Sequence, residues 1–158
     1  MVGGTTLTAN ASTGAYGSES SWGISSSHSG GGGGISKIWR QPSWQSGLAT
    51  SANKGSLSMR MVPDVSLDSN PSTGYPVYVT YPGQAGAWYA FGGTSAAAPA
   101  WAAFMAIVNQ GRVANSISRI GFANPSLYQV GKSSAYANAF HDISDSSTNL
   151  YYPALAGY

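Results

Sequence analysis

Two kinds of apolar pattern divide the chain into a strand-rich part and a helical part. Short runs rich in β-branched and aromatic residues, separated by turn signals, predict strands at residues 2–8, 59–65, 76–81 and 87–91. From Ser95 to Gln110 there is no charge and apolar side chains occupy every face, which predicts a central helix enclosed by sheet and other helices. A shorter helical piece is expected at residues 126–130.

The stretch between residues 9 and 34 is rich in Gly, Ser and Asn and has no helical period, which indicates loop or irregular strand. It ends in five consecutive glycines, Gly30 to Gly34. Such a run is either a flexible linker or a place where the backbone passes close to another backbone or a ligand. The flanking Trp22, Trp39 and Trp44 favour close approach.

The length, charge and cysteine content of the chain limit the functions that it could have. The 158 residues suit one domain or a piece of one, and the net charge of +2 arises from seven basic and five acidic residues. The sequence has no cluster of basic residues to hold a phosphate backbone, so we do not expect nucleic acid as a partner. The absence of cysteine excludes disulfides and a thiol nucleophile. A charged fraction of only 8% also means that the surface changes little in acid.

The sequence contains no segment that predicts membrane insertion or export. The most apolar segment, residues 96–108, is interrupted by Pro99 and is shorter than the roughly 20 residues that a bilayer requires. The first residues lack the positive stretch and apolar run of a signal peptide. We therefore expect no membrane partner, and nothing in this chain directs export.

A candidate nucleophile lies where the strand at 87–91 gives way to the long helix. The motif Gly92-Gly93-Thr94-Ser95 would expose a hydroxyl in a cleft, with glycines that allow a substrate chain to approach closely. The helix N-terminus favours developing negative charge, so Ser95 is the candidate nucleophile. The alternative is that Thr94 or Ser95 is merely a helix N-cap.

A base for this serine is harder to find. The acidic residues are Glu19, Asp64, Asp68, Asp142 and Asp145, and the histidines are His28 and His141. No two carboxylates are spaced four apart on a plausible helix, and the adjacent His141 and Asp142 point apart, so we expect no histidine triad. Asp64 is interpreted as structural. Trp88, Tyr89 and Phe91 could line a substrate pocket, but packing within a strand is the favoured interpretation.

Five blocks of the chain, in order, resemble the sedolisin (serine-carboxyl peptidase) family, and its kumamolisin-like branch in particular. They are Val2 to Leu7; Gly32 to Ser36 with Pro42 to Gln45; Pro63 to Ser66 with Asn70 to Tyr78; Gly92 to Pro99; and Phe140 to Ser144. The resemblance implies an α/β fold, with a subtilisin-like parallel sheet and flanking helices. Residues 1–158 would form the C-terminal half of its catalytic domain.

The resemblance also implies an activity: acid-acting endopeptidase chemistry on a polypeptide substrate, through an acyl-enzyme at Ser95, in a secreted protein. The family's catalytic Glu and its Asp partner lie upstream of the block at Val2, so they are expected in an absent N-terminal half of the same domain. Carboxylates suit acid, where imidazole is already protonated. The rival interpretation is a non-catalytic chain, such as a truncated chain or pseudoprotease without activity of its own. A surface or carbohydrate-binding module is a weaker third.

A Ca²⁺ site is the cofactor that the resemblance implies. Its ligands would be the Asp142 carboxylate and the Ile143 carbonyl, with carbonyls of a later element matched by Leu155 and Gly157. The family's closing Asp would fall at position 159, so we expect an incomplete site with weak affinity.

Overall fold

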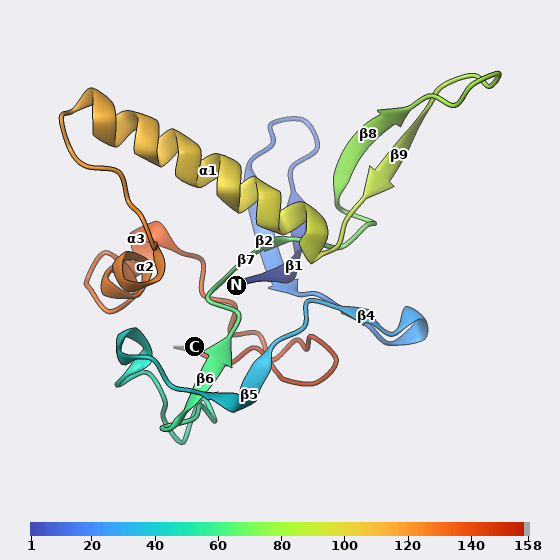
Figure 1. Ribbon diagram of the computed structural model, residues 1–158. Coiled ribbons are helices and arrows are strands. Elements are labelled where there is room, and N and C mark those ends of the chain that lie inside the picture. The colour runs from blue at the N-terminus through green and yellow to red at the C-terminus, as the bar shows by residue number, and fades with distance from the viewer. Residues whose placement is uncertain (157–158) are drawn as a thin grey trace.

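A three-stranded sheet lies at the centre of the computed structural model, which describes residues 1–156 (Figure 1). Strand β1 (Val2–Ala9) pairs in parallel with β7 (Val65–Asp68) and antiparallel with β2 (Tyr16–Ser21). The parallel pairing confirms an α/β arrangement with one parallel pair of strands.

The strand expected at 59–65 is divided in two at Pro63, because proline has no N–H to continue a ladder. Its first part, β6 (Met59–Val62), pairs antiparallel with β5 (Gly34–Arg40) at the lower edge of Figure 1. Its second part becomes β7 and joins the central sheet. Residues 63 and 64 therefore connect the two sheets.

The glycine run is a place of close approach and not a linker. The short strands β3 (Gly23–Ile24) and β4 (Ser29–Gly30) are joined through η1 (Ser25–Ser27), which is one turn of 3-10 helix. A side chain at Gly30 would lie 2.5 Å from the carbonyl oxygen of Asn149, and one at Gly33 2.8 Å from that of Val62. Asn149 secures the contact, since its Nδ2 donates to the Gly32 carbonyl at 2.9 Å.

Three α-helices follow the strands. Helix α1 (Thr94–Ala114) covers the expected 95–110, and α2 (Asn124–Gly131) covers the expected 126–130. The sequence did not predict α3 (Tyr136–Ala139) or the 3-10 turn η2 (Ser43–Gln45). Within residues 1–156, no helix combines the length and the apolar character that crossing a membrane requires.

The prediction that α1 is enclosed on all sides is wrong for the described chain. Only Ala97 is buried, where the first turns of the helix contact β1 and β7. Farther along, Phe104 is 50% exposed and Ile107 is 67% exposed. The outer face of the described helix is therefore open to solvent, although the loop after it contacts its second half, where the Ile120 N–H donates to Asn109 Oδ1 at 2.7 Å.

The hairpin of β8 (Tyr75–Val79) and β9 (Ala87–Phe91) projects away from the body near the start of α1 (Figure 1). The prediction that its aromatics pack within the strand is wrong as well. Trp88 is 70% exposed, and Tyr89 and Phe91 are each 48% exposed. The two strands form a sheet of their own, which no third strand extends in the part of the chain that the structure describes.

The exposed surface is large for a chain of this mass. The described molecule exposes 10043 Å², whereas a compact monomer of this size exposes about 7,500 Å². The apolar core is correspondingly small: among the hydrophobic residues between positions 1 and 156, only Trp22, Met61 and Ala97 are buried. The chain thus presents apolar surface that a compact monomer would have covered.

Candidate functional site

Ser95 is the second residue of α1 and is exposed. Its hydroxyl makes no hydrogen bond to any described residue. The N-cap position belongs to Gly93, which lies at φ 88° and ψ 159°, and no side chain caps the helix. The alternative in which Thr94 or Ser95 serves only as the N-cap therefore does not hold. The serine hydroxyl is available at a helix N-terminus whose first N–H groups favour negative charge.

The loop before the serine is fixed by the end of strand β7. The Gly93 N–H donates to the carbonyl of Ser69 at 2.5 Å, and Ser69 itself is completely buried. A side chain at Gly92 would lie 2.5 Å from that same carbonyl oxygen. The two glycines are thus required for different reasons. At Gly92 a side chain would collide with the Ser69 carbonyl, and at Gly93 the positive φ is one that residues with a side chain rarely adopt.

The helix that carries the serine is anchored to the same strand. The Trp101 indole donates to the Ser66 carbonyl in β7 at 3.3 Å, and Ala97 is packed with no exposed surface. Ser95 consequently lies just beyond the carboxyl end of a strand in a parallel pair. This is the position at which open α/β sheets usually place their binding sites.

None of the acidic side chains of this chain is bonded to Ser95; each is engaged elsewhere. Glu19 is bound by Thr5, Asp64 by Arg60 and Tyr128, Asp68 by Leu7 and Thr73, Asp142 by Tyr136, and Asp145 by Ser147. His141 stacks on Tyr16 with ring centroids 3.8 Å apart, and no bond joins it or His28 to the serine within residues 1–156. The described chain therefore contains a candidate nucleophile without a partner base.

Asp64 is the centre of a buried polar network. Both carboxylate oxygens accept from Arg60 Nη2, at 2.7 and 2.6 Å, and the Tyr128 hydroxyl donates to Oδ1 at 2.9 Å. Burial alone would raise the pKa of Asp64, but these hydrogen bonds outweigh it, so the pKa is lowered below its usual value. With a side chain only 1% exposed, Asp64 can receive no substrate, which supports its structural interpretation.

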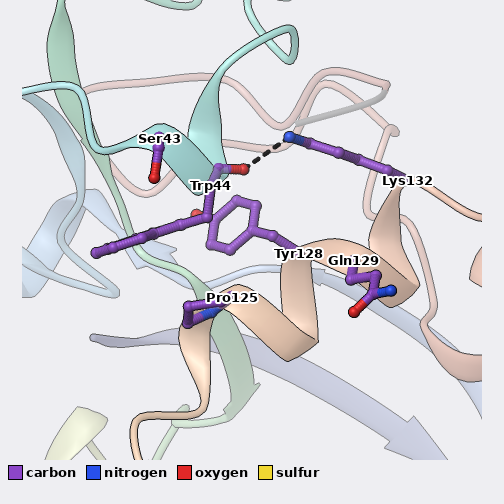
Figure 2. A pocket seen from close by; sticks show the side chains of 6 residues that line it. All are labelled: Ser43, Trp44, Pro125, Tyr128, Gln129 and Lys132. Atoms are coloured by element: carbon purple, nitrogen blue, oxygen red, sulfur yellow. Dashed lines mark hydrogen bonds between the residues drawn. The ribbon is translucent and has the colours of Figure 1, made fainter.

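Gln45 extends this network to a surface pocket. Its Nε2 donates to the Met61 carbonyl at 2.7 Å and to the Tyr128 hydroxyl at 2.6 Å, which joins η2, β6 and α2. The pocket beside it measures about 530 Å³ (Figure 2). It is lined by Ser43, Trp44, Pro125, Tyr128, Gln129 and Lys132. Because the Lys132 ammonium donates to the Trp44 and Ser46 carbonyls, it offers little to an anion, and no residue of the serine loop lines the pocket.

The structure brings only some of the expected calcium ligands near one another. The Ala154 carbonyl accepts from the Ser146 N–H at 3.1 Å, which brings Leu155 back beside the segment that follows Ile143. Burial and the Asp142 carboxylate raise the pKa of Tyr136 to about 12, since its hydroxyl is bonded to that carboxylate. Gly157 lies outside the described residues. Within residues 1–156 no three acidic or histidine side chains are close enough to hold a metal ion.

Ser69 and Trp101 hold the serine loop and its helix, and the sequence did not single out either of them. Ser69 follows a strand that pairs in parallel, so the rule that sites form at carboxyl ends could have identified it. Trp101 lies in the second turn of an apolar helix, where an indole N–H needs a partner once it is buried. Its partner is a carbonyl from a distant strand, which no local pattern reveals.

Comparisons with known proteins identify relatives over nearly the whole chain. It is 37% identical over 150 residues to kumamolisin from Bacillus sp., which covers 94% of this chain and 24% of that protein. It is 34% identical over 146 residues to sedolisin from Pseudomonas sp., covering 90% of the chain and 22% of that protein. A segment of 56 residues is 45% identical to tripeptidyl-peptidase sed1 from Aspergillus fumigatus. No protein-family model matches. The chain spans about a quarter of the length of its first two relatives.

Proposed function

This chain belongs to the sedolisin family of peptidases, and we propose that it is the serine-bearing part of a serine-carboxyl endopeptidase with a subtilisin-like fold. The observation that carries the proposal is the position of Ser95. Its hydroxyl is exposed and unbonded among the described residues, at the start of α1 and behind a glycine pair fixed to the end of β7. In this role Ser95 Oγ attacks the carbonyl carbon of a peptide bond and forms an acyl-enzyme, while the C–N bond breaks and the amine leaves with the proton that the base took from Oγ.

The attack requires a base, because a serine hydroxyl is a weak nucleophile by itself. The base we propose is a glutamate, aligned by an aspartate, in the part of the domain that precedes residue 1. A carboxylate remains able to accept a proton in acid, where histidine is already protonated. The exposed apolar faces of α1 supply the surface on which that part of the domain would pack. The whole protein would act on polypeptides outside the cell.

The rival function, a chain with no hydrolytic activity of its own, is favoured by one observation. Every acidic side chain is engaged away from Ser95, and no described histidine reaches it. A nucleophile and its base act as a unit, so losing one forfeits most of the catalysis. We therefore propose that residues 1–158 alone do not hydrolyse peptides, and that activity needs the remainder of the domain.

We also propose weak Ca²⁺ binding. The oxygen donors are the Asp142 carboxylate and the carbonyls of Ile143, Leu155 and Gly157, which suit a hard cation. Bound calcium would tie the 140–144 segment to the end of the described chain. The Tyr136 hydroxyl already holds the Asp142 carboxylate. A calcium ion must therefore compete with that bond, which limits the affinity.

A chimera tests the catalytic proposal. Residues 1–158 replace the matching segment of kumamolisin, and hydrolysis of a quenched fluorescent peptide is measured between about pH 3 and 7, which spans the ordinary carboxyl and histidine pKa values. We expect activity with an acidic optimum, loss of that activity in Ser95→Ala, and no activity from residues 1–158 alone. Ser126→Ala, a change of an exposed serine in α2, is the matched control and should leave the rate unchanged.

Two results would contradict the proposal. Activity that persists in the Ser95→Ala chimera would show that another group is the nucleophile. A neutral optimum that disappears with His141→Ala would show that the base is a histidine of this chain.

A further inference from the structure

An uncharged aromatic surface leads directly to the candidate nucleophile. Residues 75–91, which form β8, β9 and the turn between them, contain no charged residue and no histidine. Tyr78 and Trp88 lie directly opposite each other in the ladder, with ring centroids 5.2 Å apart in an edge-to-face arrangement. They are nevertheless 53% and 70% exposed. We call these two residues the aromatic pair.

The hairpin is built in a way that requires a partner. An isolated two-stranded hairpin is marginal in water, and an exposed aromatic patch commonly marks an interaction site. Directly opposed residues lie on the same face of a sheet, so the aromatic pair forms one face, while Val77 and Tyr89 form the other. Val77 and Tyr89 are 42% and 48% exposed, so both faces are apolar and open.

The covalent connection to Ser95 indicates the occupant. Trp88 precedes Ser95 by seven residues, and Gly92 and Gly93 are the only residues between the end of β9 and the start of α1. An extended chain advances about 3.3 Å per residue. Trp88 and Ser95 can therefore be no farther apart than about seven extended residues span. In a substrate whose scissile carbonyl lies at Ser95, a residue within about seven positions of the scissile bond can reach the aromatic pair. Residues 75–91 offer a charged side chain no ion-pair partner, and an anionic side chain would meet the negative faces of the aromatic rings.

From this geometry we infer that the aromatic pair is a remote docking site for an uncharged apolar stretch of the polypeptide substrate, within about seven residues of the bond that Ser95 attacks. The inference rests on the proposed function for its occupant. It gives the exposed hairpin a role in substrate choice: long apolar substrates gain contacts that short ones cannot make, through aromatic residues of the kind that dominate binding surfaces.

Peptide binding tests the inference without requiring catalysis. A blocked twelve-residue peptide of alternating Leu and Ser is titrated to about 2 mM into residues 1–158, and the heat of binding is followed by calorimetry, which does not depend on Trp88 as a reporter. We expect saturable binding that a Glu/Ser peptide of equal length does not show, because carboxylates are not attracted to the faces of aromatic rings. Trp88→Thr, which retains a strand-forming residue, should weaken binding about tenfold, as expected when an aromatic anchor is removed.

Trp39→Thr is the matched control, because Trp39 is 71% exposed on β5, away from the hairpin. We expect it to bind the peptide as the unchanged chain does. Equal losses in both tryptophan variants, no saturation with the Leu/Ser peptide, or equal binding of the Glu/Ser peptide would overturn the inference. So would a Trp88→Thr effect on sedimentation alone, which would make the hairpin a contact between copies of this chain.

The same variants in the kumamolisin chimera separate the two proposals. If the peptide binds at Trp88 while the chimera hydrolyses nothing, the proposed function fails and the hairpin remains a peptide-binding surface. If the chimera is active and Trp88→Thr affects twelve-residue and four-residue substrates equally, the docking site fails and the function stands. Selective loss on the longer substrate, with Ser95→Ala still binding the peptide, supports both.

Discussion

The exposed face of α1 should make the isolated chain self-associate, and charge on that face should reverse it. Phe104 and Ile107 are three residues apart, so they lie on one side of the helix, and they are 50% and 67% exposed. Exposed apolar area of this extent is a recognised route to association. The perturbation is the double change Phe104→Lys and Ile107→Lys.

The magnitude follows from the exposed area. Full burial of a large apolar side chain contributes about 1.5–3 kcal/mol. Since half to two-thirds of each side chain is exposed, covering both would contribute about 2–4 kcal/mol per copy. Removing that contribution lowers the association constant by at least about thirtyfold, since about 1.4 kcal/mol corresponds to a factor of ten.

Sedimentation velocity over about 2–200 μM measures the effect, because this range of about a hundredfold is wider than the thirtyfold shift. The control is Ile38→Lys in β5 with Leu57→Lys in the loop before β6, which adds the same charge at residues that are 80% and 81% exposed. We expect the α1 variant to be monomeric at concentrations where the control still associates. If the unchanged chain is a cooperatively melting monomer throughout, or if the control dissociates equally, the reasoning about α1 is refuted.

Three further predictions concern the serine loop, the buried network and calcium. Gly93→Ala, at φ 88°, should destabilise the chain by about 1–3 kcal/mol in urea unfolding and lower the turnover of the chimera. Asp64→Asn should cost about 3–5 kcal/mol, because it leaves Arg60 without its charge partner. The pKa of Asp64 is lower in the folded chain than its ordinary value of 3.8. The stabilisation from the ionised carboxylate is therefore complete above that value and is lost as the pH falls from it through the lowered pKa. The urea midpoint of the Asn variant should consequently depend less on pH in acid. Calorimetry should show weak calcium binding that tightens when an aspartate is appended after Tyr158.

The sequence predicted the elements around the serine better than their environment. The strand at 87–91, the glycine pair and the helix beginning near Ser95 follow from local apolar pattern and from Pro99, which cannot donate to the Ser95 carbonyl. Exposure could not be predicted in the same way. Apolar residues on every face of a helix indicate that it needs covering, but they do not indicate whether the covering surface belongs to the same chain.

Long-range contacts account for most of what the sequence did not reveal. The bond from Gly93 to Ser69 joins residues 24 positions apart, and Tyr128 reaches Asp64 across 64 positions. Neither has a periodic signature. The division of one expected strand into β6 and β7 had a visible signal in Pro63, whereas the pairing of each half with a different sheet depends on tertiary structure.

The contact between the glycine run and Asn149 has a consequence for the order of folding. Because glycine leaves room for the backbone around Asn149, the β3–β4 region is packed only when residues about 120 positions later are present, as in the bond from Asn149 to Gly32. The bond from the Ser21 N–H to Ser147 spans 126 positions. During synthesis, the early segment must therefore remain open until nearly the whole described chain has left the ribosome. Such non-local closure slows folding.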